Sequence, residues 1–202
     1  MNYFIFKTII FQIRNVIFSK FYLYLMFLSI FEIFKIGIGP SSSHTMGPMV
    51  AAARFLELMR SSAFTFCGVK GSLHGSLAFT GIGHATDRAI ILGLAGFEPK
   101  TYDHAKAHST LTAIRKTNRV TPPDLPTLKF NPQKDLHFDF GPNLPGHSNG
   151  MILMATDEQD DVVLQETYYS VGGGFVLNAC ELARELDTEM ISDVPYPFKS
   201  AA

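Results

Sequence analysis

The sequence of 202 residues predicts an α+β fold, in which helices pack against a mixed or antiparallel sheet. Two patterns support this fold class. Apolar residues recur at helical spacing after residues 47 and 87. Strand patterns follow, because residues 135–140 alternate between apolar and polar, and a short polar connection joins the strand-like segments 151–155 and 162–169. The length is enough for one substantial hydrophobic core, so we expect one main domain, with or without appendages.

Three helices are expected in the first two thirds of the chain. The first spans Gly47–Arg60, because Pro48 suits a first helical turn and the apolar residues that follow keep a helical period. The second opens near Asp87, after a glycine-containing turn, and ends at Gly96. The third is more polar and covers Tyr102–Arg119.

Strands are expected between and after these helices. The stretch Thr65–Phe79 is strand-like, and its three glycines indicate close backbone approach or bulging. Asp135–Phe140 alternates as a strand. Met151–Ala155 and Val162–Tyr169 are predicted to form a hairpin, because a short polar connection separates them.

The remaining segments are turns, loops and one short helix. Thr121–Pro132 contains four prolines and is predicted to be a loop or linker. Gly172–Gly174 interrupts the strand pattern. A short helix is expected over Ala179–Leu186, and the abrupt end of the chain after it indicates a truncated protein.

The charge and the cysteines exclude several classes of function. The formal net charge is −1 and the basic residues are scattered, so no basic face for nucleic acid is expected. Cys67 and Cys180 are far apart and belong to no C-x-x-C pattern. Neither a disulfide framework nor a zinc site built from cysteines is therefore predicted.

Residues 1–25 form an unusual apolar extension, rich in Phe, Ile and Tyr. Lys7, Arg14 and Lys20 interrupt it before a full bilayer span accumulates. One interpretation is a helix that lies on a membrane surface. We prefer the interpretation that this segment lies outside the fold, with the true start at Met26.

The most informative segment is the turn that precedes the first helix, Gly37–Thr45. Glycines and Pro40 allow backbone to come close to a ligand, and hydroxyls and one imidazole crowd at the start of a helix. The positive end of a helix favours a carboxylate or phosphate there. A serine-rich turn that only caps the helix is the simpler alternative. The candidate ligand residues are Ser41, Ser42, Ser43, His44 and Thr45.

A second turn of similar design, Thr80–Asp87, precedes the second helix and carries His84. It superficially resembles phosphate-binding turns. The sequence contains neither G-x-G-x-x-G nor G-K-[ST], so a nucleotide site is only weakly supported.

The chain resembles the iron–sulfur-dependent L-serine dehydratases (L-serine deaminases) of the single-chain type. The resemblance is carried by five ordered segments: SIFEIFKIGIGPSSSHTMGPM, GSLAFTGIGHATDRAIILGLAGFEP, LPGHSNGM, YYSVGGGF and VPYPFKSA. It covers residues 26–202 and corresponds to the family's N-terminal, β-chain-like substrate-binding domain.

The resemblance implies an L-serine ammonia-lyase of serine catabolism, which deaminates L-serine to pyruvate and ammonia with a [4Fe–4S] cluster and without pyridoxal phosphate. It places the catalytic base on His84, with Asp87 as a candidate to orient its ring; a helix-end charge accounts for Asp87 equally well. It places His147 and Asn149 in the same substrate site, where the simpler alternative is a polar turn. A cytoplasmic homodimer, not bound to a membrane, is expected.

One departure from the family is clear. The family's cluster ligands are cysteines of a C-terminal domain, and Cys67 and Cys180 match none of them. Two cysteines cannot supply three thiolate ligands, so no cluster or other metal is expected on this chain alone. We therefore expect an inactive fragment, or one half of an enzyme whose partner is the iron–sulfur catalytic domain. The alternative is a non-catalytic, allosteric domain that binds serine or another anion.

Overall fold

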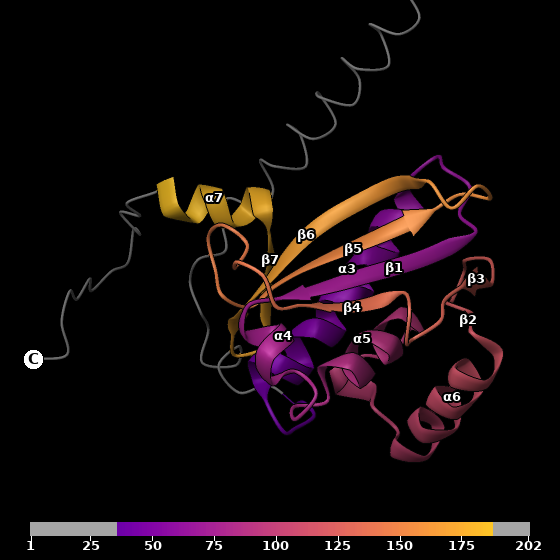
Figure 1. The fold of residues 1–202 in the computed structure, drawn as a ribbon. Helices are drawn as coiled ribbons and strands as arrows, with labels where there is room; N and C mark the ends of the chain where they lie inside the picture. The colour runs from indigo at the N-terminus through magenta and orange to yellow at the C-terminus, as the bar shows by residue number, and fades with distance from the viewer. Residues whose placement is uncertain (1–35, 188–202) are drawn as a thin grey trace, which may run out of the picture. The chain divides into compact units, whose positions relative to one another are not determined.

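The computed structural model describes residues 36–187 (Figure 1). The helices are the π-helical turn η1 (Ser42–Met46), α3 (Gly47–Ser61), α4 (Ser76–Thr80), α5 (Thr86–Leu94), the 3₁₀ turn η2 (Pro99–Thr101), α6 (His104–Thr117) and α7 (Ala179–Asp187). The strands are β1 (Gly68–His74), β2 (Arg119–Val120), β3 (Leu128–Lys129), β4 (Leu136–Asp139), β5 (Gly150–Thr156), β6 (Val162–Gly172) and β7 (Phe175–Asn178).

These strands form one mixed sheet, so the predicted α+β class is confirmed. The order is β2-β3-β1-β5-β6-β7, and β4 pairs with β1 beside β3. β1 runs parallel to β3 and β4, whereas every other pairing is antiparallel. The predicted hairpin is confirmed as β5–β6, with Leu153 opposite Glu166.

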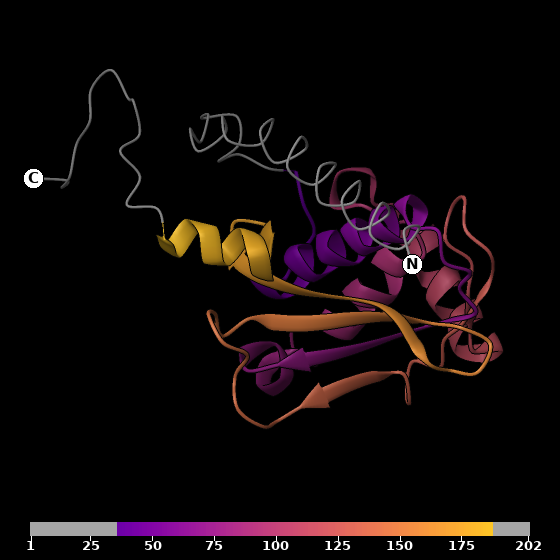
Figure 2. The same ribbon diagram turned by 90° about the horizontal axis from the view of Figure 1, so that it is seen from above.

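The core lies between one face of the sheet and the helices α3 and α5 (Figure 2). Phe55 and Leu56 of α3 and Leu73 of β1 are at most 1% exposed. Alternate residues of β1 and β5 are buried because successive side chains of a strand point to opposite faces. Burial of each such side chain stabilises the fold by about 1.5–3 kcal/mol.

The two core helices touch at Gly93 of α5. A Cβ atom at this position would lie 2.5 Å from the Met49 carbonyl oxygen and 2.6 Å from Ala52 Cβ, both on α3. Only glycine therefore allows the observed approach of the two helices. This approach matters for the site, because α3 and α5 each begin at one of the two turns singled out above.

We predict that Gly93→Ala lowers the free energy of unfolding by about 1–2 kcal/mol. Overpacking costs roughly 1–3 kcal/mol, and the better helix propensity of alanine returns up to about 1 kcal/mol. Urea denaturation of the variant and the wild type measures the difference. Unchanged or higher stability would show that α3 and α5 are not held in this close packing.

The stretch Thr65–Phe79 differs from the expected strand. β1 ends at His74, and Gly75 (φ 55°, ψ −130°) redirects the chain into the short helix α4. Phe79 therefore lies on a helix, where it is 65% exposed and contacts the ring of Phe140 with ring centroids 5.3 Å apart. The backbone conformation of Gly75 ends the strand and starts the helix, and no periodic pattern of apolar residues in the sequence marks this change.

The predicted proline-rich loop also differs, because it contains β3. This strand pairs with β2 and β1. β7 was not predicted, and it follows the turn at Gly172–Gly174. Both strands have at most four residues, which is too short for alternation to be recognised.

Three predictions fall outside the described residues: the apolar extension 1–25, the domain start at Met26 and the segment VPYPFKSA. Across residues 36–187, no helix combines the length and the apolar character needed to cross a membrane.

Candidate active site

The hydroxyl-rich turn leads directly into α3. Ser41 has an extended backbone, and its Oγ accepts a hydrogen bond from the backbone N–H of His44 at 3.1 Å. Ser41 therefore caps η1, in line with the capping alternative, whereas α3 itself has no side-chain cap. Ser42 is exposed and Ser43 is half-buried, and both lie in η1, which continues into the 15-residue helix α3.

The second turn positions His84 just before α5. Ala85 has a left-handed backbone (φ 57°) and separates the turn from the helix. The imidazole Nδ1 of His84 lies 2.9 Å from the carbonyl oxygen of Thr80. A carbonyl oxygen only accepts hydrogen bonds, so Nδ1 carries the hydrogen and Nε2 holds the lone pair in the neutral ring. Nε2 is therefore the proton-accepting atom.

The two turns meet through their histidines. The rings of His44 and His84 are 4.8 Å apart between centroids, with an interplanar angle of 40°. Two threonine hydroxyls tie the turns together reciprocally. Thr45 Oγ1 donates to the carbonyl oxygen of His84 at 2.8 Å, and Thr86 Oγ1 donates to that of His44 at 2.6 Å. Both threonines are buried, so this lock is shielded from water.

The ring of His44 is held at both nitrogens. Nδ1 lies 2.9 Å from Ser43 Oγ, and Nε2 lies 2.9 Å from Ser76 Oγ at the start of α4. Burial lowers the pKa of His44 most, and the nearby His84 lowers it further. The contact with Ser76 raises this pKa and offsets part of the shift. A neutral ring with both nitrogens engaged suits a group that orients hydroxyls, whereas His84 retains a nitrogen for proton transfer.

We predict that the stability of the chain falls as the pH drops below about 6.5. Burial lowers the pKa of His44, and burial also lowers the pKa of His74. The unfolded chain then binds protons that the folded chain resists, so unfolding takes up protons and acid favours it. Urea midpoints between about pH 7.5 and pH 5.5 measure this slope. His44→Gln is expected to reduce this dependence of stability on pH. An unchanged dependence in the variant would contradict the contribution of His44.

A third turn, residues 140–149 between β4 and β5, carries His147 and Asn149 and packs beside α4. The backbone N–H of Asn149 donates to His147 Nδ1 at 3.0 Å, so Nε2 carries the hydrogen in the neutral ring. The carbonyl oxygen of Ser148 accepts from the N–H of Ser76 at 2.9 Å. Ser76 therefore connects this turn to His44, because its hydroxyl bonds the His44 ring.

Asn149 links the third turn to the start of α3 through Ser170 of β6. Asn149 Nδ2 donates to the Ser170 carbonyl oxygen, and the N–H of Ser170 donates to the Asn149 carbonyl oxygen, each at 3.0 Å. The Oγ of Ser170 is fully buried and has no hydrogen-bond partner among the described residues. It packs against Gly47, the first residue of α3, where any side chain would clash with it.

We predict that Ser170→Ala raises the free energy of unfolding by about 1–2 kcal/mol, because a buried, unpaired hydroxyl carries a desolvation cost. Ser72→Ala is the matched control, since Ser72 Oγ bonds His74 Nε2 at 2.8 Å. Urea denaturation measures the free energy of unfolding of both variants and of the wild type. A loss of stability in Ser170→Ala would show that this hydroxyl has a partner in the folded protein.

The structure brings together most of the predicted site residues. Ser43, His44 and His84 form one contiguous cluster, and the third turn joins it through Ser76. Thr45 has a buried hydroxyl that positions His84, and its contact with substrate stays a prediction. Substrate contacts of the other predicted residues are likewise predictions: Ser41, Ser42, Ser43, His44, His147 and Asn149.

Asp87 does not hold the His84 ring, because that ring bonds the Thr80 carbonyl. Asp87 lies instead in the first turn of α5, with its carboxylate 3.8 Å from Arg115. The helix-end alternative is therefore the better account. No role was predicted from the sequence for Ser76 and Thr86. Both lie within the segment GSLAFTGIGHATDRAIILGLAGFEP, yet their roles depend on contacts between distant segments.

The cysteines of the chain do not suit an iron–sulfur cluster. Cys67 is half-buried just before β1 and Cys180 is exposed on α7, so they come from separate elements. No group of three or more His, Cys, Asp or Glu side chains is arranged to hold a metal ion within the described part of the chain. The site offers a base, hydroxyl groups and a positive helix end, but no thiolate ligand set.

Comparison with known proteins assigns a family. The family model of the serine dehydratase beta chain matches residues 29–181. The L-serine dehydratase of Streptomyces coelicolor is 40% identical over 179 residues, 87% of this chain and 39% of the relative. L-serine dehydratase 1 of Escherichia coli K12 is 40% identical over 177 residues, which are 86% of this chain and 38% of the relative. An L-serine dehydratase of Helicobacter pylori J99 is 42% identical over 173 residues, which are also 86% of this chain and 38% of the relative.

The chain thus spans less than two fifths of the length of these curated relatives. The matched residues include all three turns of the candidate site, from Gly37 to Asn149. The resemblance noted in the sequence is therefore confirmed at the level of the domain, and the chain belongs to the serine dehydratase beta-chain family.

Proposed function

We propose that this chain forms the substrate-binding part of an L-serine ammonia-lyase, which converts L-serine to pyruvate and ammonia. The observation that carries the proposal is the pair of histidines, locked together beside the start of α3, with the proton-accepting nitrogen of His84 defined by its bond to Thr80. The choice of L-serine as the substrate rests on the relatives that are named L-serine dehydratase.

The residues of the site match the demands of the reaction. The α-carboxylate of serine would bind at the start of η1, the helical turn that continues into α3, where the hydroxyls of Ser41–Ser43 and the positive helix end favour an anion. His84 Nε2 would accept the α-proton. The Cα–H and Cβ–O bonds break as the Cα=Cβ bond forms, and the resulting enamine tautomerises and hydrolyses in water to pyruvate and ammonia.

Departure of the serine hydroxyl needs an electrophile. This chain does not supply the thiolates for a cluster, so we propose that a [4Fe–4S] cluster is held by cysteines of another part of the enzyme, as the family resemblance implies. The role of this chain is then to bind serine, orient it and accept the proton. We also propose that the protein works as a homodimer in the cytoplasm.

Calorimetric titration of L-serine into the purified chain tests the binding part of this proposal. We expect binding at one site, which weakens at least tenfold in Ser43→Ala, because this change removes a hydroxyl near the helix start and a partner of His44. Absence of any heat would contradict the proposal. Binding without any turnover in the complete enzyme would favour a non-catalytic, allosteric role, which is the second candidate.

A further inference from the structure

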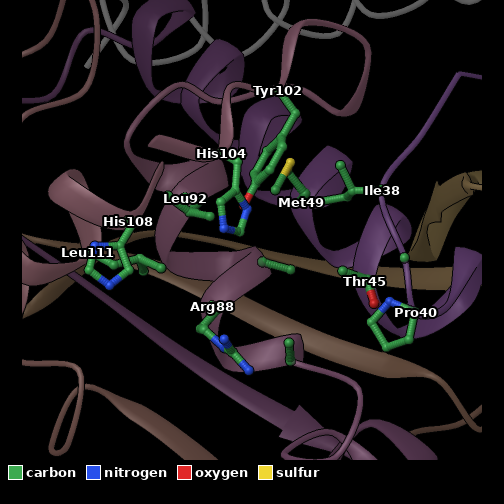
Figure 3. Close-up of a pocket in the computed structure, with 13 residues that line it drawn as sticks. Ile38, Pro40, Thr45, Met49, Arg88, Leu92, Tyr102, His104, His108 and Leu111 are labelled. Atoms are coloured by element: carbon green, nitrogen blue, oxygen red, sulfur yellow. The ribbon is translucent and has the colours of Figure 1, made fainter. Parts of the chain in front are cut away.

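A separate pocket lies next to the histidine pair, between α3, α5 and α6 (Figure 3). Its volume is about 420 Å³, which is within the usual range of small-molecule sites. Residues 38–40 close one side. Of the predicted site residues only Thr45 lines it, so the pocket adjoins the candidate active site without coinciding with it.

The inner surface of the pocket is largely apolar. Ile38, Pro40 and Tyr102 line it and keep part of their surface accessible, whereas Met49 of α3, Leu92 of α5 and Leu111 of α6 line it as buried residues. The rings of Tyr102 and His104 also line the pocket, at 6.4 Å between centroids and an angle of 62°. Two rings in a largely apolar lining suit an aromatic or otherwise apolar guest.

Among the described residues that line the pocket, Arg88 alone carries a formal charge at pH 7. Arg88, His104 and His108 line it, and no aspartate or glutamate does so among the described residues (Figure 3). Arg88 is exposed and has no hydrogen bond or ion pair within residues 36–187. Its neighbour Asp87 faces Arg115 instead, at 3.8 Å. The guanidinium of Arg88 is therefore accessible to an anionic group of a ligand that occupies the pocket.

We propose that this pocket binds a small molecule that carries one carboxylate on an apolar body. Arg88 binds the carboxylate, since a guanidinium matches its two oxygens in a bidentate geometry. The apolar body packs against the accessible surfaces of Ile38, Pro40 and Tyr102. L-serine fits this pocket poorly, because its short, polar side chain leaves the apolar surface uncovered. The inference is independent of the proposed reaction with serine.

Titration of the full chain with 3-phenylpropionate tests the proposal. We expect a dissociation constant of about 1 mM or lower, given the size of this ligand. Neutral 3-phenylpropionamide is expected to bind at least tenfold more weakly. Arg88→Gln is expected to weaken the binding of 3-phenylpropionate at least tenfold. Arg119→Gln is the matched control, because Arg119 is an exposed arginine on β2, and it is expected to leave the binding unchanged. Amide NMR shifts should centre on Thr45, Ala85 and Leu92.

Several results would overturn the proposal. These are no detectable binding, equal binding of the amide, equal losses in both arginine variants, or NMR shifts that lie away from the pocket. Displacement of 3-phenylpropionate by L-serine would show that the pocket belongs to the serine site. Failure of serine to bind leaves these outcomes unaffected, so the two proposals fail separately.

Discussion

Replacing His84 by alanine is expected to lower L-serine turnover by roughly 10²–10⁴-fold, the usual contribution of a general base. The assay uses a hybrid enzyme, which is this chain joined to the part of a curated L-serine dehydratase that the chain does not match. The variant loses Nε2, the proton-accepting atom, whereas the Thr45–His84 carbonyl bond and the start of α5 involve only backbone atoms of this residue. Its fold is therefore expected to persist.

His137→Ala is the matched control, because His137 is exposed on β4 and is not part of the three turns. The control should retain the turnover of the wild type. Urea denaturation of both variants separates a catalytic loss from unfolding. Full turnover in His84→Ala would exclude His84 as the base, and equal losses in the two variants would attribute the effect to general damage.

Gly75→Ala is expected to lower the free energy of unfolding by about 3 kcal/mol or more. The backbone of Gly75 (φ 55°, ψ −130°) is strained for any residue with a side chain, which costs roughly 1–3 kcal/mol. The new Cβ would also clash with the Ser148 carbonyl oxygen and lie 2.5 Å from Asn143 Oδ1. Overpacking of this kind costs about 1–3 kcal/mol. The third turn would then separate from α4.

Gly83→Ala provides the comparison, since its Cβ would come no closer than 3.6 Å to the Thr80 carbonyl oxygen. We expect it to change stability by less than about 0.5 kcal/mol, as is usual for surface substitutions. Urea denaturation measures both variants, and amide exchange at Ser76 reports whether its bond to Ser148 opens. Similar stabilities in the two variants would contradict the close docking of the third turn at Gly75.

Local patterns in the sequence predicted much of the fold. The period of α3 and the polar connection of the β5–β6 hairpin are local features, and both elements appear as expected. The break at Gly75 could not be predicted, because no periodic pattern marks its positive φ, and Ser148, which lies against it, is more than 70 residues away. β3 has two residues and exists only through its pairing with β1 and β2.

The candidate site shows the same division. The hydroxyl cluster and the two histidines stand out in the sequence because their residue types are concentrated in short turns. The reciprocal bonds of Thr45 and Thr86, and the contact of Ser76 with His44, join segments that are more than 30 residues apart. Only the folded structure shows these contacts, and they assign Thr45 a positioning role.

Pyruvate formation from L-serine by the hybrid enzyme measures the proposed function most directly. The positive control is the same remainder joined to the matching segment of its own relative. We predict that this chain restores pyruvate formation when it is joined to the remainder, and that neither part forms pyruvate alone. A folded hybrid enzyme that forms no pyruvate, alongside an active positive control, would contradict the account.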